Sequence, residues 1–378
     1  MKTLATVIAA LACLLYFTDA RAQGCVAVRN YSCAAPMAED SAGGSHWQLT
    51  LGYRYLKSHR HFVGTEEQKQ RALQRSEVIN HTNSLDVSLS YSINARWSVS
   101  ATLPLTHSAR SSLYEHGFDG DADGNPEIDL DGDGKPDRDP DDRYTTRAYG
   151  IGDLRLTGYY RILDPVRNPN RNVIVGLGLK FPTGQDGARD VFYKSTGPQE
   201  RVVDQSIQPG DGGWGINTEV QFFYDLFKGL GVYANGFYLF NPMDTNKVDR
   251  GGGTYGIDHY FSVADQYLGR GGMFYANHQT GLGVSLGLRM EGVPGNDVFG
   301  KDSGFRRPGF TFSIEPGVTF HRNQHALELN VPIALVRDRV QSYSDKIKTL
   351  APGGKYTNGD AAFADYLVFL TYAVKFGK

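Results

Sequence analysis

The last residues of the chain alternate strictly and end close to an aromatic residue. Every second position from 366 is apolar: Tyr366, Val368, Leu370, Tyr372, Val374 and Phe376. A strand with lipid on one face and a barrel lumen on the other requires this pattern. A half-buried strand of a soluble sheet has the same period, so the other segments must decide between the two. In a barrel the intervening residues, Asp365, Thr371, Ala373 and Lys375, should face inward.

The N-terminus has the organisation of a secretory signal peptide. Lys2 precedes an apolar run from Leu4 to Leu15, and Ala20-Arg21-Ala22 has the small-x-small pattern of a cleavage site. We therefore expect residues 1–22 to be removed and the mature chain to begin near Gln23. No other segment has the roughly 18 consecutive apolar residues of a transmembrane helix, which excludes a helical inner-membrane protein.

Removal of the signal peptide takes Cys13 with it and leaves Cys25 and Cys33. An even pair in an oxidising compartment predicts a short local disulfide, and free or metal-bound thiols are the alternative. Neither cysteine has the leucine three residues upstream that lipoprotein processing prefers, so we expect no lipid anchor.

Composition fits an all-β membrane protein. Glycine contributes 45 of 378 residues and aromatic residues 12%. The mean hydropathy is only -0.39, as expected when each strand turns half of its side chains to lipid and half to a polar lumen.

Twelve segments alternate with period two. Most of them have about 10 residues, the length that a tilted membrane strand requires. Val173, Val175, Leu177, Leu179 and Phe181 show the pattern clearly. The sequence therefore predicts an all-β, transmembrane, antiparallel up-and-down barrel of twelve strands. The predicted strands are 47–57, 83–93, 97–107, 150–162, 171–181, 214–225, 230–240, 264–276, 281–292, 309–321, 325–336 and 363–376.

Connections between these strands alternate short and long, as periplasmic turns and external loops do in outer-membrane barrels. The aromatic residues gather near both predicted interfaces, as rings that prefer the headgroup level should. We divide the chain into a signal peptide (1–22), a periplasmic segment or plug (23–46) and the barrel (47–378). The expected long loops are 58–82, 108–149, 182–213, 241–263, 293–308 and 337–362.

The loop over 108–149 contains a ten-residue repeat of the form D-x-D-x-D-G. Three carboxylates around one point, with glycine at the sixth position for a sharp turn, are typical of calcium loops. The usual glutamate at position twelve is absent, and the repeats resemble those of thrombospondin type 3 and dockerin-like segments. The predicted ligands of structural Ca²⁺ are Asp119, Asp121, Asp123 and Glu127 in the first copy and Asp129, Asp131, Asp133 and Asp137 in the second.

The alternative for this loop is a solvated acidic segment without a bound ion. Residues 119–142 carry ten Asp and one Glu against Lys135 and Arg138, a local charge of -9. Because the whole chain carries -2, the remainder is cationic by about 7 charges, and we place part of that excess inside the barrel.

The alternation turns a set of charged side chains inward. Charge inside a membrane barrel must be paired or hydrated, so the set predicts a polar lumen. It could form a selectivity constriction, with cations on one wall and carboxylates opposite, or a salt-bridge web that fills a narrow barrel. The inward set is Arg54, Arg155, Lys180, Glu219, Arg270, Arg289, Glu291 and Glu315, with Asp86, Asp153, Arg161 and Glu328 beside them.

Residues 292–309 are rich in glycine and proline and contain Arg306 and Arg307. We expect this external loop to fold back toward the lumen and one of the two arginines to pair with Glu291 or Glu315, because a buried guanidinium seeks carboxylates.

Several blocks resemble the family of outer-membrane transporters named for the MetA pathway of phenol degradation. They are Gly150 to Leu156 with Tyr160-Arg161, Phe181-Pro182-Thr183-Gly184, Arg289 to Pro294, Gly304 to Gly309, Glu315-Pro316-Gly317 and Ala362 to Tyr366. The resemblance covers the chain from about residue 150 onward. It implies an outer-membrane barrel and a route for small, often aromatic, molecules. The acidic repeat departs from the family pattern.

No catalytic constellation is convincing. A Ser-His-Asn set on the lipid face, as in outer-membrane phospholipases, would have to come from His107, Ser108 or Ser111, and Asn83, whose spacing is not specific. We expect a non-enzymatic, porin-like channel of a Gram-negative outer membrane, with lipid around it and a small aromatic or anionic solute as ligand, and no nucleic acid partner. The alternatives are a calcium-stabilised structural or adhesive barrel and, third, a hydrolase.

Overall fold

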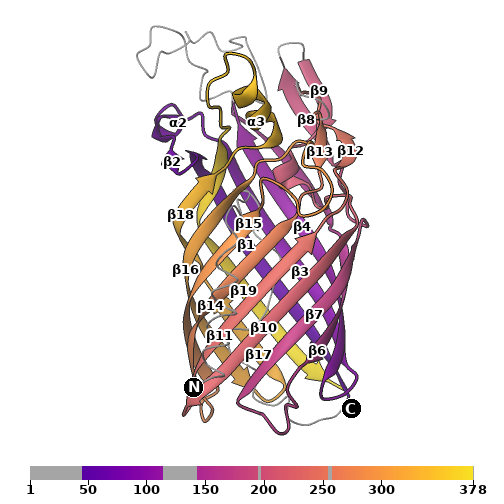
Figure 1. The fold of residues 1–378 in the computed structure, drawn as a ribbon, viewed down its shortest axis with the longest axis vertical. Coiled ribbons are helices and arrows are strands. Elements are labelled where there is room, and N and C mark those ends of the chain that lie inside the picture. Colours follow the sequence, from indigo (N-terminus) through magenta and orange to yellow (C-terminus); the bar gives the residue numbers. More distant parts are fainter. Residues whose placement is uncertain (1–44, 114–142, 195–196, 254–257, 378) are drawn as a thin grey trace.

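The computed structural model describes residues 45–113, 143–194, 197–253 and 258–377. Fifteen of the described strands form one antiparallel sheet that closes into a barrel where β1 (His46–Val63) pairs with β19 (Ala361–Phe376), and two small two-stranded sheets lie outside it (Figure 1). The predicted twelve-stranded barrel is confirmed. Its crossings are β1 (His46–Val63), β3 (Ile79–Ser92), β4 (Trp97–Ser112), β5 and β6 (Tyr144–Ile151, Leu154–Arg161), β7 (Arg171–Phe181), β10 (Gly215–Phe227), β11 (Leu230–Phe240), β14 (Gln266–Asn277), β15 (Leu282–Val293), β16 (Gly309–Arg322), β17 and β18 (His325–Asn330, Ile333–Arg339) and β19 (Ala361–Phe376).

Several strands run further at the external end than the sequence predicted. β1 continues to Val63, and β4 continues to Ser112 before β5 begins at Tyr144. The loop expected over 108–149 is therefore shorter, because the polar residues at its edges belong to strands that extend past the apolar band. His46, expected in the N-terminal segment, already belongs to β1.

The strands turn alternate side chains to the outside and the lumen. On β15 the outward Leu286 is 56% exposed, whereas the inward Arg289 is 1% exposed. The same alternation on β19 leaves Phe376 outward and buries Phe369. A continuous apolar band around a barrel is stable only when lipid covers it. Within the described residues, no helix is long and apolar enough to cross a membrane.

Aromatic pairs form a girdle at the end of the barrel that carries the short turns. Trp47 stacks on Tyr91 and Trp97 on Tyr160, each with ring centroids 4.7 Å apart. Amphipathic rings prefer the headgroup level of a bilayer. The predicted periplasmic aromatic band is thus present.

Short elements cover the opposite, external end (Figure 1). In α3 the Ser342 side chain accepts the Asp345 N–H while the Asp345 carboxylate accepts the Ser342 N–H, so the helix begins with a capping box. The external elements are β2 (Glu66–Glu67), α2 (Lys69–Leu73), β8 (Arg189–Lys194), β9 (Gly197–Val202), the 3-10 helix η3 (Gln205–Ile207), β12 (Thr245–Asp249), β13 (Tyr260–Ser262) and α3 (Tyr343–Leu350).

A one-residue bulge separates β5 from β6. Leu105 of β4 pairs with Ile151, but Thr102 pairs with Arg155, so one extra residue is inserted opposite Pro104. Even-numbered residues face inward before the bulge and odd-numbered residues after it. Asp153, inside the bulge, therefore points into the barrel, which matters for the site below.

Candidate solute site in the barrel lumen

Inward-facing charges are largely buried, as the alternation predicted. Arg54 and Lys180 are 2% and 3% exposed, and Asp86 is fully buried. Glu219, Arg270, Arg289, Glu291 and Glu315 are also buried, and Arg155 lies inward on β6 and is half-buried. Their proposed part in selectivity stays a prediction.

Four of these residues form an ion-pair web on one wall. Arg289 donates two hydrogen bonds to the carboxylate of Glu291, both at 3.0 Å. Glu315 Oε1 accepts from Arg270 at 3.1 Å and from Arg289 at 3.4 Å. The Arg289 guanidinium also lies 4.6 Å from the centroid of the Phe369 ring. These ion pairs connect β14, β15 and β16, and the cation–π contact with Phe369 adds β19.

Of the two alternatives for the inward charges, the salt-bridge web is the one that these four residues form. Arg270, Arg289, Glu291 and Glu315 sit on neighbouring strands and neutralise one another. Uncompensated charge of one sign is too costly at low dielectric, so pairs form wherever strand register permits. On this wall, the inward charges form a salt-bridge web and not a constriction with cations facing carboxylates across the lumen.

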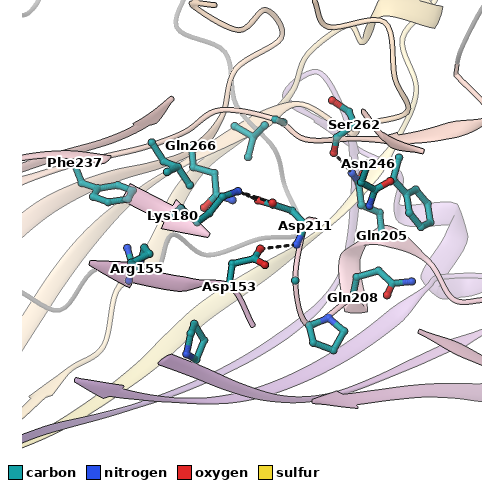
Figure 2. Close-up of a pocket in the computed structure, with 17 residues that line it drawn as sticks. Asp153, Arg155, Lys180, Gln205, Gln208, Asp211, Phe237, Asn246, Ser262 and Gln266 are labelled. Atoms are coloured by element: carbon teal, nitrogen blue, oxygen red, sulfur yellow. Dashed lines mark hydrogen bonds and ion pairs between the residues drawn. The ribbon is translucent and has the colours of Figure 1, made fainter. Parts of the chain in front are cut away.

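On the other side of the barrel, Asp153 organises an external loop. Its Oδ1 accepts the Gly184 N–H at 2.9 Å and its Oδ2 accepts the Asp211 N–H at 2.8 Å. The Asp211 carboxylate in turn pairs with Lys180 (Figure 2). Both ends of the segment 184–211 are therefore held at one inward carboxylate. We call its described parts, 184–194 and 197–211, the cap: the β8–β9 hairpin projects beyond the external end of the barrel (Figure 1), and residues between Gln205 and Asp211 face the lumen wall.

Two glycines let the backbone approach Asp153 this closely. A Cβ at Gly184 would lie 2.7 Å from Gly152 C and 2.9 Å from Asp153 Oδ1. A Cβ at Gly210 would lie 2.9 Å from Gly184 C and 3.0 Å from the same Oδ1. Real Cβ atoms do not come so near, which explains the glycine of the Phe181-Pro182-Thr183-Gly184 block.

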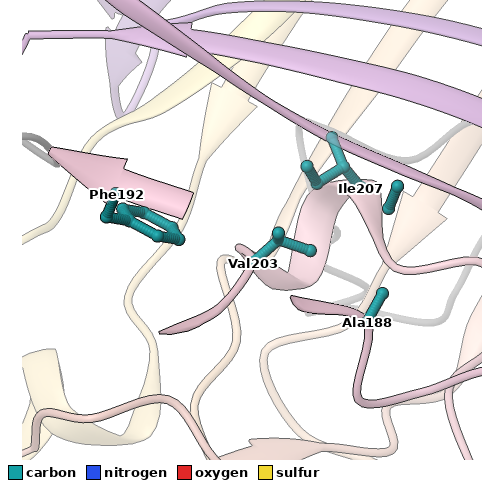
Figure 3. Close-up of a cluster of buried hydrophobic side chains, with 5 residues drawn as sticks. Ala188, Phe192, Val203 and Ile207 are labelled. Carbon is teal, nitrogen blue, oxygen red and sulfur yellow. The ribbon is translucent and has the colours of Figure 1, made fainter. Parts of the chain in front are cut away.

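Apolar packing makes the cap a folded unit. Val203 and Ile207 are fully buried and pack with Phe192 and Ala188 of the cap and with the inward Ala148 of β5 (Figure 3). Gln208 accepts the Ala188 N–H at 2.8 Å and donates to the Val203 carbonyl at 2.9 Å. Because these apolar side chains are buried and Gln208 bonds the backbone on both sides of the cap, the cap is positioned rather than loose.

Asp204 fastens the cap to a second external loop. Its carboxylate accepts two hydrogen bonds from Arg307, at 2.8 and 2.7 Å, and lies 3.7 Å from Arg110 of β4. It also caps η3 by accepting the Ser206 N–H. Burial alone would raise the pKa of Asp204, but the Arg110 and Arg307 guanidiniums hold it well below its ordinary value.

The loop before β16 does pair its arginines with carboxylates, but not with the predicted ones. Arg306 forms a bidentate pair with Asp297, and Arg307 pairs with Asp204. Glu291 and Glu315 are already engaged with Arg270 and Arg289. The prediction of carboxylate pairing is confirmed, and the named partners are wrong, because the loop stays among the external segments.

A cavity of about 120 Å³ lies between the cap and the lumen wall. The barrel contributes Asp153, Arg155, Lys180 and Phe237, and the loops contribute glutamine, asparagine and aromatic side chains (Figure 2). The Arg155 guanidinium lies 5.6 Å from the centroid of the Phe237 ring. The cavity therefore combines a cation, an apolar surface and amide groups. Its lining residues from the loops are Gln205, Gln208, Pro209, Gly210, Asp211, Asn246, Phe261 and Ser262.

The considered Ser-His-Asn set is not assembled. Ser108 faces the lumen and donates to Thr82 at 3.2 Å, whereas His107 faces outward. Ser111 faces outward too, but four residues along a strand separate it from His107 by about 13 Å. Asn83, opposite His107, accepts from the Tyr53 hydroxyl at 2.7 Å.

The eight predicted calcium ligands, from Asp119 to Asp137, and the pair Cys25 and Cys33 lie outside the described residues. Within residues 45–113, 143–194, 197–253 and 258–377, no group of three or more His, Cys, Asp or Glu side chains is arranged to hold a metal ion.

Sequence reasoning did not identify Asp204, Asp211 and Asp297 as anchors. The run Asp204-Gln205-Ser206 has the form of a helix N-cap and could have indicated an ordered segment there. Asp211 pairs with Lys180, 31 residues away, and Asp297 pairs with Arg306, nine residues away in an irregular loop, and neither separation follows a helix or strand period.

Comparison with known proteins supports the barrel fold. No family model matches the chain, so the resemblance to the MetA-pathway family stays a prediction. The COG4313 outer membrane channel from Pseudomonas putida F1 superposes with a TM-score of 0.52 at 13% identity, covering 93% of this chain and all of that one. The P. putida toluene transporter TodX (TM-score 0.40, 9% identity, 91% and 94% covered) and a Pseudomonas aeruginosa FadL homologue (0.39, 9%, 90% and 92%) are too distant to argue from.

The closed twelve-stranded barrel and its outward apolar band together locate the protein in the outer membrane of a Gram-negative bacterium.

Proposed function

We propose that the protein is a passive channel for small solutes and that it favours solutes combining an aromatic ring with an anionic group. The observation that carries the proposal is the cavity beneath the cap, where Arg155 lies beside the Phe237 ring. A small solute entering from outside would meet this cavity at the barrel mouth.

Arg155 is the cation in this cavity that can serve a solute. Lys180 is occupied by Asp211, whereas Arg155 forms no ion pair within the described part of the chain. A guanidinium binds carboxylates through charge-assisted hydrogen bonds, and Phe237 and Phe261 offer apolar surface for a ring. The P. putida protein with the similar fold is described as an outer membrane channel, which supports the general function only.

Liposome swelling tests this proposal. The refolded barrel should admit benzoate faster than benzyl alcohol, a neutral molecule of similar shape. Arg155→Gln should slow benzoate about tenfold, because one charge-assisted hydrogen bond contributes about 1.5 to 3 kcal/mol, and leave benzyl alcohol unchanged.

The matched control is Lys228→Gln, which removes one cation from the exposed turn between β10 and β11. Equal rates for the two solutes, unaffected by Arg155→Gln, would refute the anionic preference. Absence of any swelling would refute the channel itself and favour the alternative of a structural surface barrel, to which the ion-pair web and the packed cap are equally suited.

A further inference from the structure

Four neighbouring strands carry basic side chains on their outward faces near the external end. Lys57 on β1, His81 on β3, His107 on β4 and Arg147 on β5 all occupy outward positions of the alternation. His107 and Arg147 are exposed, and Lys57 and His81 are half-buried. We call these four residues the basic patch.

The basic patch lies at one level of the membrane. On β1, β3 and β4 its members stand ten residues from the periplasmic girdle, counted from Trp47, Tyr91 and Trp97. Ten residues of a strand tilted by about 40° rise about 25 Å, which is the height of the apolar band of outer-membrane barrels. Lys57, His81 and His107 are thus among the first polar outward side chains beyond the hydrocarbon, at the external headgroups, and Arg147, opposite Ala109, stands two residues further out than His107.

Strand register makes the patch continuous. Lys57 lies directly opposite His81, and Ala109, which neighbours His107 on the outward face of β4, lies opposite Arg147. The Tyr55 hydroxyl is 3.2 Å from His81 Nδ1. Side chains directly opposite in an antiparallel pair are about 5 Å apart, so neighbouring members can share one ligand.

The patch occupies one side of the barrel. On the other strands the outward residues at the external ends include the acidic Asp338 of β18 and otherwise aromatic or apolar side chains, as at Phe181, Trp214, Phe240, Tyr267, Met290 and Phe310. A general interfacial girdle would distribute basic residues around the whole circumference. Their restriction to β1, β3, β4 and β5 indicates a local partner.

The two permanent cations of the patch are available. In the described ranges, neither Lys57 nor Arg147 forms an ion pair with another side chain. Two nearby carboxylates do not pair with these side chains. Asp365 pairs with Arg60 and Arg337, and Asp190 accepts the backbone N–H of Arg147 at 2.7 Å rather than its guanidinium.

We propose that the basic patch binds a phosphorylated glycolipid of the outer leaflet, with Lys57 and Arg147 contacting its phosphates. A phosphate at the headgroup level offers the charge that these cations lack, and the imidazoles and tyrosine hydroxyls add hydrogen bonds to the sugar. The acyl chains would lie along the apolar face below, formed by Leu85, Leu105 and Ile151.

The test measures binding of lipid A to the delipidated full-length barrel by native mass spectrometry. Diphosphoryl lipid A should bind more tightly than its monophosphoryl form. The double variant Lys57→Gln, Arg147→Gln should bind diphosphoryl lipid A about thirtyfold more weakly, since each basic residue near an anionic lipid surface contributes about 1 kcal/mol.

The matched control is Lys228→Gln with Arg322→Gln, which removes two exposed cations from the periplasmic rim. It should bind lipid A as the unaltered protein does, and both double variants should keep the same heat-modifiable electrophoretic mobility. Unchanged affinity in the patch variant, or an equal loss in the control, would overturn the proposal. Equal binding of the two lipid A forms, or equally tight binding of phosphatidylglycerol, would overturn recognition of glycolipid phosphates.

Discussion

The carboxylate of Asp153 accepts the backbone N–H of Asp211, 58 residues further along the chain, at 2.8 Å. Its other oxygen accepts the Gly184 N–H. One side chain, turned inward by a bulge, therefore holds both ends of the cap.

Replacing Asp153 with Asn should loosen the cap. The amide keeps one acceptor oxygen, so one of the two backbone N–H groups loses its partner at a cost of about 1 to 3 kcal/mol. Single-channel recordings should show a larger and noisier conductance. Asp302→Asn, at a loop residue without a side-chain partner among the described residues, serves as the control and should leave the conductance unchanged.

Replacing Glu315 with Gln should destabilise the barrel while hardly changing its ion preference. Glu315 is 1% exposed and is shared by Arg270 and Arg289, so its neutralisation leaves two buried cations short of countercharge. Removing one member of a buried ion pair costs about 3 to 5 kcal/mol. Urea unfolding in lipid vesicles measures this loss. A large shift in reversal potential with normal stability would show instead that the web selects ions.

The external contact between Asp360 and His61 should weaken in acid. Burial opposes ionisation, but the hydrogen bond from His61 and the charges of His61 and Arg71 lower the pKa of Asp360 to about 2. Because the folded pKa lies below the ordinary value of 3.8, the stabilisation is present above pH 4 and disappears as the pH falls from about 4 to 2. The pKa difference corresponds to about 2 kcal/mol.

Hydrogen exchange of residues 352–360 between pH 5 and 2 measures this effect. Protection should fall within that window in the unaltered protein. In Asp360→Asn the protection should be low throughout and independent of pH, and a persisting pH dependence would assign the effect to another carboxylate.

The acidic repeat should bind calcium. Two copies of D-x-D-x-D-G and a local charge of -9 predict two ions, with dissociation constants on the order of 10⁻⁴ to 10⁻³ M, as in extracellular modules. Calorimetric titration of the purified barrel measures binding. The double variant Asp121→Asn, Asp131→Asn should abolish the heat of calcium binding. If the unaltered protein gave no heat at millimolar calcium, the segment would be an acidic loop without a bound ion.

The barrel was predictable because its rule is local. Period-two alternation placed Arg289 and Glu315 inside and Leu286 outside, and the backbone geometry of a strand enforces that arrangement whatever its partners are. The closing pair of β1 and β19 then follows from an even number of antiparallel strands.

The partners of the inward and loop charges were not predictable in the same way. Arg307 pairs with Asp204, 103 residues away, because two external loops meet there, and Lys180 of β7 pairs with Asp211, because the end of the cap returns to the barrel wall. Contacts of this kind follow no periodic pattern in the sequence. The lengths of the strands at the external end were also underestimated. Outward polar residues such as Lys57 end the apolar pattern there, although the hydrogen-bonded strand continues.

Because a bulge separates β5 from β6, the direction of the side chains in this crossing depends on the number of residues in it rather than on which residues they are. Deleting Gly152 would remove the extra residue and reverse the phase of one half of the crossing, sending Tyr149 and Ile151 toward the lumen and Ala148 toward lipid. Asp153, in phase with β6, would still point inward, but the β5 wall on which the cap packs at Ala148 would be inverted. Any relative that keeps this cap must therefore keep the residue count here, even where every side chain around it changes.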